Sequence, residues 1–224
     1  MSSRALAIRF CSIVSALAVL VGATIFAPPA SAALQKFVYQ VRHSTYGRIG
    51  TYTNSVEKVG DQTTVKTEGQ ILVSILGIVL YRQDLNRVER WAGERLISFQ
   101  GMTTTNGRAI EVTGEAAGNS FAVNTPNGTF EAPAMVKLAN PWSADMLKGE
   151  TMLTPDRGQL EDVQIRPAEM TSVAVNGAMV QARRYEISRL TGEKRYEVWI
   201  DDEGTPVMFN VSTRRGMVTF TLTS

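Results

Sequence analysis

Apolar and polar residues alternate along most of the chain, in short segments that end at turn residues. For example, Phe37, Tyr39 and Val41 alternate with Val38, Gln40 and Arg42. This alternation predicts a strand with one buried face. Similar segments recur to the C-terminus, with the clearest hairpin signals at Asn106-Gly107 and Asn176-Gly177. The pattern predicts a mainly β fold, a large curled antiparallel meander that forms a half-barrel or a barrel.

One segment breaks the alternation and predicts the single helix of the domain. Asn140 can cap a helix, Pro141 suits its first turn, and Gly149 can close it. Residues 134–139 favour a helical lead-in to this segment. We therefore expect one short helix beside the sheet.

The first 32 residues have the pattern of a secretory signal peptide. Arg4 and Arg9 begin it, an apolar run over residues 10–26 follows, and Ala30-Ser31-Ala32 is the motif that a signal peptidase cleaves. Cleavage after Ala32 leaves one β-rich domain, residues 33–224, in the periplasm. The alternative is an uncleaved anchor, because a run of about 17 residues is the lower limit for a membrane span. We expect no stable membrane span after signal removal, since no later segment is long enough.

Cysteine content and charge narrow the classes of function. The single cysteine, Cys11, lies in the predicted signal, so the mature chain has no disulfide, cysteine nucleophile or thiolate metal site. The chain has 23 basic and 21 acidic residues, and the two arginines of the signal account for the difference. This balance argues against a nucleic-acid partner. The adjacent pairs Arg183-Arg184 and Arg214-Arg215 are expected at solvated strand edges or turns rather than at anion sites.

The sequence contains no constellation that predicts catalysis or metal binding. His43 is the sole histidine, and neither a serine motif nor a carboxylate accompanies it to make it a base. Without thiolates, one histidine also argues against a zinc site. Residues 201–204 lack the alternating oxygen ligands of a calcium loop, so we expect a hairpin turn there. We expect a non-enzymatic protein without a metal or cofactor, and an enzyme centred on His43 is the alternative.

The most conspicuous segment is Ile71–Leu80, in which both alternating faces are apolar. Only Ser74 and Gly77 interrupt this run. A strand with one solvated face does not have such a pattern. Either a helix or a second layer covers its outer face, or the run forms an apolar rim or lining that meets a lipid or a protein partner.

Three tryptophans are either core residues or the lining of a ligand cavity, because tryptophan combines a large apolar surface with one donor. We therefore expect an apolar or lipid-like ligand to bind in the curl of the sheet. The alternative is an interaction or assembly module that joins a protein of the cell envelope. The residues expected to touch the ligand are Ile71, Val73, Ile75, Leu76, Ile78, Trp91, Trp142 and Trp199.

Several segments that place tryptophans beside turns point to a family. They are Glu89–Leu96, Thr103–Gly107, Asn140–Trp142, Leu153–Leu160, and Tyr196–Asp201 with Gly204. In these segments the chain resembles a family of uncharacterised proteobacterial periplasmic proteins, catalogued as a domain of unknown function. The resemblance implies an architecture similar to that of lipoprotein carriers, in which an antiparallel half-barrel wraps a helix and shields an apolar cavity. It brings no catalytic residues.

Overall fold

The computed structural model describes residues 33–190 and 195–224, and the predicted signal peptide lies outside these residues. The described part contains fifteen strands and one short helical turn. The strands are β1 (Ala33–His43), β2 (Gly47–Val59), β3 (Gln62–Ile75), β4 (Ile78–Ala92), β5 (Arg95–Thr105), β6 (Arg108–Ala117), β7 (Ser120–Thr125), β8 (Gly128–Pro133), β9 (Lys137–Leu138), β10 (Thr151–Thr154), β11 (Gln159–Val175), β12 (Ala178–Arg189), β13 (Arg195–Asp201), β14 (Pro206–Thr213) and β15 (Gly216–Leu222).

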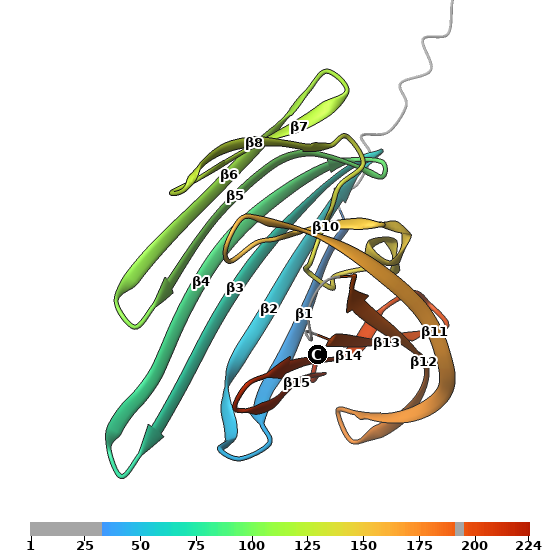
Figure 1. Cartoon of the computed structure of the whole chain (residues 1–224). Coiled ribbons are helices and arrows are strands. Elements are labelled where there is room, and N and C mark those ends of the chain that lie inside the picture. The colour runs from blue at the N-terminus through green and yellow to red at the C-terminus, as the bar shows by residue number, and fades with distance from the viewer. Residues whose placement is uncertain (1–32, 191–194) are drawn as a thin grey trace, which may run out of the picture.

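All the strands belong to one curled sheet (Figure 1). Its hydrogen-bonded order runs from β8 down to β1, passes to β15, and then runs down to β9. Neighbouring strands are antiparallel except for the short parallel pair β9 and β10. The sheet is not closed, because β8 and β9 form its two edges. The predicted antiparallel meander is therefore confirmed in its half-barrel form.

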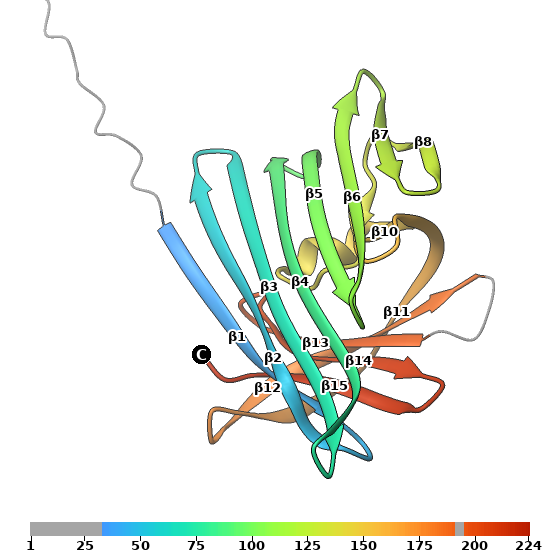
Figure 2. The ribbon, with the colours of Figure 1, turned by 90° about the vertical axis from the view of Figure 1, so that its left-hand side faces the viewer.

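The curl brings the two halves of the sheet face to face. In Figure 2 the red strands β13–β15 cross the long blue and green strands at a steep angle. Aromatic side chains fill the space between these halves, where the rings of Phe209 and Phe220 stack with centroids 4.2 Å apart. The edge of the Tyr39 ring meets Phe209, and the edge of the Tyr52 ring meets Phe220. Burial of these large side chains is the main force that holds the curl.

A second core cluster lies under the other arm of the sheet. Leu96, Phe99 and Phe121 come from β5 and β7, and they pack with Leu138 of β9 and Leu153 of β10, which follow β8 in the chain. All five side chains are almost fully buried. The concave face of the sheet is therefore covered by the chain itself along residues 134–154.

The predicted helix is only partly correct. The structure has one turn of 3-10 helix, η1 (Ala144–Lys148), which Ser143 caps and which ends at Gly149 as predicted. Asn140 does not cap it, because its side chain takes part in a buried hydrogen-bond network described below. The helical lead-in expected at residues 134–139 is wrong, since these residues form a turn and β9. In the part of the chain that the structure describes, no helix is long and apolar enough to cross a membrane.

Candidate functional site

The β3–β4 hairpin projects from the sheet as a free ribbon of two strands. Strand β2 leaves β3 at the pair Gly50–Ile71, and β5 leaves β4 at the pair Gln83–Thr105. Between these points, residues 72–82 form strand pairs only with each other among the described residues. We call residues 72–81 the apolar ribbon. Figure 1 shows it extending past the turns of the neighbouring strands, at the lower left of the view.

Most side chains of the apolar ribbon face solvent. Leu76, at the turn, is 98% exposed, and Ile78 beside it is 66% exposed. Val73 and Tyr81 anchor its base, because they pack against the core between the two halves of the sheet. The expectation that a helix or a second layer covers this run is wrong. The exposed apolar side chains of the ribbon are Leu72, Ile75, Leu76, Ile78, Val79 and Leu80.

The turn of the ribbon has an unusual residue at its first position. Leu76 has a φ of 49° and Gly77 a φ of 81°. Glycine accepts such angles freely, whereas leucine is strained there because its Cβ crowds the backbone. A polar residue in this exposed turn would serve the folded state at least as well as the strained leucine does. The stability of the fold therefore does not explain a leucine at this position.

A second group of candidate residues surrounds Glu89, inside the curl. The carboxylate of Glu89 has no solvent exposure. Its Oε2 accepts hydrogen bonds from the indole N–H groups of Trp91 and Trp142, each at 3.0 Å. Asn140 donates to Oε1. One carboxylate therefore joins β4 to the irregular segment that covers the sheet.

Asn140 extends this network to β2 and β3. Tyr52 donates to Asn140 Oδ1 at 2.6 Å, and Asn140 Nδ2 lies 3.0 Å from Thr67 Oγ1. Thr67 in turn donates to Asn54 at 2.8 Å. We call this set of residues the Glu89 network, and its members are Tyr52, Asn54, Thr67, Glu89, Trp91, Asn140 and Trp142. It satisfies polar groups that would otherwise be buried without partners, and it fixes the covering segment to three strands.

Burial sets the protonation of the Glu89 network. Desolvation raises the pKa of Glu89 to about 7, although its three hydrogen-bond donors act in the opposite direction. Burial also raises the pKa of Tyr52 to about 12, so its hydroxyl stays protonated and donates to Asn140. Glu89 has no contact with solvent, and its hydrogen bonds hold the covering segment against the sheet.

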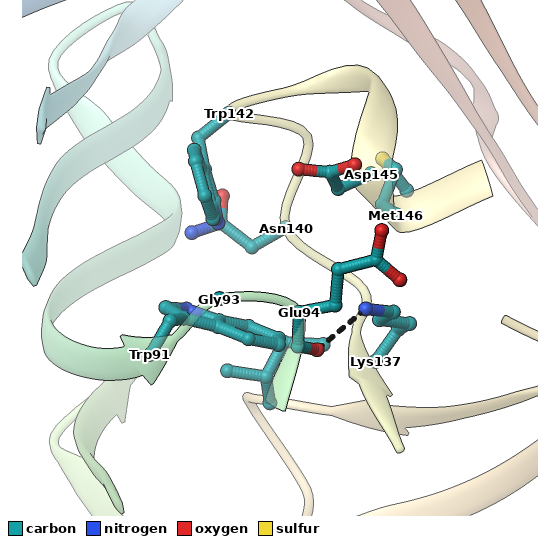
Figure 3. A pocket seen from close by; sticks show the side chains of 9 residues that line it. Trp91, Gly93, Glu94, Lys137, Asn140, Trp142, Asp145 and Met146 are labelled. Carbon is teal, nitrogen blue, oxygen red and sulfur yellow. Dashed lines mark hydrogen bonds between the residues drawn. The ribbon is translucent and has the colours of Figure 1, made fainter. Parts of the chain in front are cut away.

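The space between Trp91 and Trp142 is small. The two rings lie with centroids 6.0 Å apart and their planes tilted by 57°, and Figure 3 shows Trp142 above Trp91 in this view. The Lys137 ammonium donates to the Glu94 carbonyl at 2.7 Å and lies 5.4 Å from the Trp91 ring. The remaining cavity measures about 10 Å³, which is room for one water. The space between these two tryptophans is therefore too small for an acyl chain.

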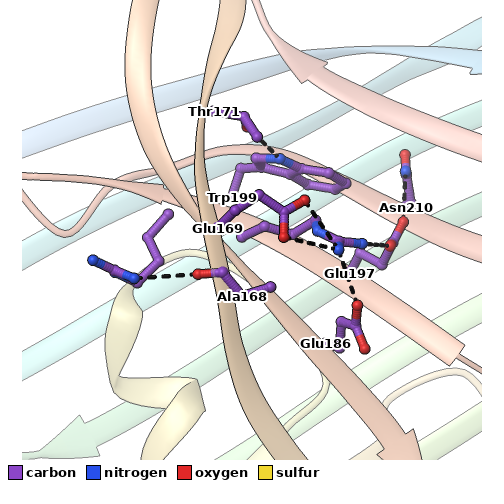
Figure 4. A network of polar contacts seen from close by, with 9 residues as sticks. Ala168, Glu169, Thr171, Glu186, Glu197, Trp199 and Asn210 are labelled. Atoms are coloured by element: carbon purple, nitrogen blue, oxygen red, sulfur yellow. Dashed lines mark hydrogen bonds and ion pairs between the residues drawn. The ribbon is translucent and has the colours of Figure 1, made fainter.

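Trp199 lies apart from the other two tryptophans, on the opposite face of β13 from the core residues Val198 and Ile200. Its indole N–H donates to Thr171 at 3.0 Å, and Figure 4 shows β11 passing over it. Beside it, Arg184 forms ion pairs with three carboxylates, at distances from 2.6 to 3.1 Å. An open groove of about 630 Å³ follows these residues. The three carboxylates belong to Glu169, Glu186 and Glu197.

The structure distributes the eight predicted ligand residues over four places. Ile71 and Val73 are buried at the base of the ribbon, whereas Ile75, Leu76 and Ile78 are exposed on it. The three tryptophans lie elsewhere, two in the Glu89 network and one beneath β11. They do not line one common cavity, and the ribbon is the only one of these places where apolar predicted residues gather at the surface of the described chain.

The structure also places His43 and the segment 201–204, which the sequence analysis named. His43 is buried, and its Nδ1 accepts a hydrogen bond from the Thr45 backbone N–H at 3.0 Å. The segment 201–204 is a hairpin turn, as predicted, in which Asp201 Oδ1 accepts from the backbone N–H of Glu203 and of Thr205. Such a carboxylate caps its own turn.

Sequence reasoning missed Glu89, although a signal for it exists. Leu85, Arg87, Glu89 and Trp91 follow one another at a spacing of two, and all four are buried. Because alternate residues of a strand share a face, the two charged residues lie on the same face as the leucine and the tryptophan. A charged pair on the apolar face of a strand predicts a buried polar network.

Comparisons with known proteins agree with this fold. Among solved structures, the chain is similar to the crystal structure of a beta-barrel-like protein of domain of unknown function DUF1849 from Brucella abortus. The TM-score is 0.64 at 8% sequence identity, and the match covers 85% of this chain and 96% of that one. No curated protein matches the sequence. A family model described as a domain of unknown function, DUF6134, matches residues 39–223, and the chain therefore belongs to this family.

Proposed function

We propose that the chain is an exported, non-enzymatic protein that binds an apolar, lipid-like surface through the apolar ribbon. The observation that carries the proposal is the exposure of six large apolar side chains on a hairpin without neighbouring strands. An isolated hairpin of two strands is marginally stable in water. Contiguous exposed apolar surface of this kind is typical of a contact with a membrane or a partner.

The dimensions of the ribbon suit a lipid surface. With a rise of about 3.4 Å per residue, Ile78 lies about 14 Å from Arg82 at the base of the hairpin. The free edges of the ribbon carry backbone N–H and C=O groups that hydrocarbon cannot satisfy. We therefore place the tip at the boundary between headgroups and acyl chains, about 5–10 Å deep, where water still reaches these groups.

Binding would follow from burial of the exposed side chains. Each large apolar side chain that leaves water contributes about 1.5–3 kcal/mol when fully buried. The strain at Leu76 is tolerated in the free protein and is offset on binding, because the leucine is then the most deeply placed residue. No covalent step is involved.

The same ribbon offers an alternative role in protein interaction. Its two edges expose unpaired backbone groups over residues 72–81, and an extended segment of another protein pairs readily with such an edge. An envelope assembly module would use the ribbon in this way. This alternative predicts binding to one protein rather than to lipid vesicles.

Export is the part of the proposal that depends on the first 32 residues. Their basic start, apolar run and Ala-Ser-Ala motif are typical of a cleaved signal. A periplasmic location would bring the ribbon to the surface of a membrane from outside the cytoplasm. The mass of the protein recovered from the periplasm tests this part directly.

Vesicle flotation tests the role of the ribbon. The purified protein is mixed with vesicles of phosphatidylcholine and phosphatidylglycerol, and the floated fraction is compared between variants with the same N terminus. The variant Ile75→Thr/Ile78→Thr keeps β-branched side chains and removes apolar surface. The control Leu34→Thr removes an apolar side chain at the start of β1, away from the ribbon. Leu34 is 71% exposed.

We expect the wild type and Leu34→Thr to float with the vesicles, and the double variant to lose at least about 10-fold in affinity, since two buried side chains contribute several kcal/mol. If the double variant floats as well as the wild type, or if no form of the protein floats, the ribbon does not bind lipid and the proposal is rejected.

A further inference from the structure

At the ribbon end of the sheet, several turns carry arginines and no carboxylates. Four segments meet there, namely residues 42–48, 72–82, 105–108 and 213–216, and none contains Asp or Glu. Hydrogen bonds join them in two pairs, because the backbone N–H of Arg82 donates to Asn106 and the backbone N–H of Ser44 donates to Met217. Each of the arginines is exposed. They are Arg42, Arg48, Arg82, Arg108, Arg214 and Arg215.

Turns at the opposite end of the sheet carry carboxylates. Asp61 and Glu94 lie in the turns that follow β2 and β4, and residues 201–203 are two aspartates and a glutamate. A hydrogen bond from Gly93 to Asp61 joins the first two of these turns. The total charge of the chain is nearly balanced, but the arginines of the four segments and the carboxylates of these turns lie at opposite ends of the sheet. Net charge alone conceals this arrangement.

One pair of arginines is placed where the fold gains nothing from it. Arg42 lies opposite Arg48 across β1 and β2. Like charges directly opposite each other in a sheet destabilise it. In this respect the pair resembles the strained Leu76, since both features are unfavourable within the fold and both occur at the same end of the sheet.

Most of these arginines have no carboxylate partner. Arg82 pairs with Asp84 at 2.8 Å, and the nearby Asp156 pairs with Arg157 at 3.4 Å. The other five arginines of the four segments form no ion pair with any residue in the ranges 33–190 and 195–224. Their guanidinium groups are therefore available to an external anion.

We infer that these arginines bind the phosphodiester headgroups of an anionic lipid bilayer while the ribbon enters its surface; this rests on the function proposed above. Guanidinium groups bind phosphate oxygens in a bidentate manner. Arg82 lies at the base of the ribbon, at the depth of the headgroups when the tip is inserted. Tyr46, which is 36% exposed in the β1–β2 turn, is of the type that gathers at this depth.

The inference predicts a preference for lipid charge, which can be separated from apolar binding. Binding of the wild type is measured on vesicles of phosphatidylcholine alone and on vesicles with about one third phosphatidylglycerol, each at low and at high salt. The variant Arg42→Gln/Arg48→Gln removes two positive charges at the ribbon end. The control Lys58→Gln/Arg90→Gln removes two exposed positive charges near the other end.

We expect the wild type to bind the anionic vesicles about 10-fold or more tightly than the neutral ones at low salt, with the preference reduced by salt. The variant Arg42→Gln/Arg48→Gln loses most of this preference and keeps its fold, whereas the control retains it. Equal binding of the wild type to both kinds of vesicle overturns the inference and leaves the proposed function standing. Binding to neither kind overturns the proposed function, as does a ribbon that forms a stable complex only with a protein.

Discussion

Leu76 and Asn106 occupy the same position in two hairpin turns, with φ angles of 49° and 50°. Each is followed by a glycine, at 81° and 83°, and Asn176-Gly177 repeats the geometry at 48° and 82°. Asparagine tolerates this left-handed conformation because its short polar side chain bonds the local backbone. The chain therefore uses the favourable residue in two turns and an apolar one in the third, at the tip of the apolar ribbon.

The first prediction follows from this comparison. Leu76→Asn replaces a strained residue by the one that the other two turns use, so the free energy of unfolding should rise by about 1 kcal/mol. For a chain of this size the midpoint of thermal unfolding should rise by about 2–4 °C. The same substitution should weaken vesicle binding, because it removes the most exposed apolar side chain. Calorimetry and vesicle flotation of one preparation measure both effects.

The control for this prediction is Asn106→Leu, which places a leucine in an equivalent turn beside the ribbon. It should lower the midpoint of unfolding and leave vesicle binding unchanged or slightly stronger. If Leu76→Asn lowers both stability and binding, Leu76 serves the fold rather than a contact, and the interpretation of the ribbon fails.

The local pattern of the sequence predicts the strands well, because alternation and turn residues act over short distances. The hairpins at Asn106-Gly107 and Asn176-Gly177 are confirmed, and so is the open, curled meander. The run Ile71–Leu80 could not be placed in the same way. Its exposure depends on where β2 and β5 end relative to β3 and β4, and register between strands is a property of the whole sheet.

The helix and the tryptophans show the same limit. Asn140 has the residue type of a helix cap, but it is drawn into contact with Tyr52, Thr67 and Glu89, which lie 51 to 88 positions away in sequence. Long-range partners override local preference in such cases. The charge pattern was also present in the sequence, yet only the fold shows that four turns rich in arginine lie at one end.

The second prediction concerns the Glu89 network. Asn140→Ala leaves the Tyr52 hydroxyl and the Glu89 Oε1 without their partner in a buried site. Each unsatisfied group costs about 1–3 kcal/mol, so the midpoint of unfolding should fall by several degrees. The covering segment should also become more sensitive to proteases near η1, because the network fixes it to the sheet. Thermal unfolding and limited proteolysis with mass spectrometry measure these effects.

The matched control is Asn127→Ala, since Asn127 lies exposed in the turn between β7 and β8. It should change the midpoint by less than about 1–2 °C, as expected for a surface substitution. Unchanged stability and unchanged cleavage in Asn140→Ala would show that the network does not hold the covering segment. Vesicle binding should survive Asn140→Ala, because the ribbon lies outside this network.

The third prediction gives the stability of the fold a pH dependence of defined sign. Burial raises the pKa of Glu89 to about 7 in the folded state, whereas an unfolded glutamate titrates near about 4.3. Between these values the folded state holds a proton that the unfolded state has lost. The contribution of Glu89 is therefore most favourable below about pH 4.3, and it falls as the pH rises to about 7.

Glu89→Gln removes this titration while keeping the size of the side chain. Relative to the variant, the wild type should lose on the order of 3 kcal/mol of unfolding free energy between pH 4.5 and pH 8, because each pKa unit corresponds to about 1.4 kcal/mol. Urea unfolding at several pH values gives this difference. Glu111→Gln, at an exposed site on β6, should follow the wild type throughout. Parallel profiles for the wild type and Glu89→Gln would show that Glu89 is ionised in the folded protein across this range, with its three donors outweighing the cost of burial.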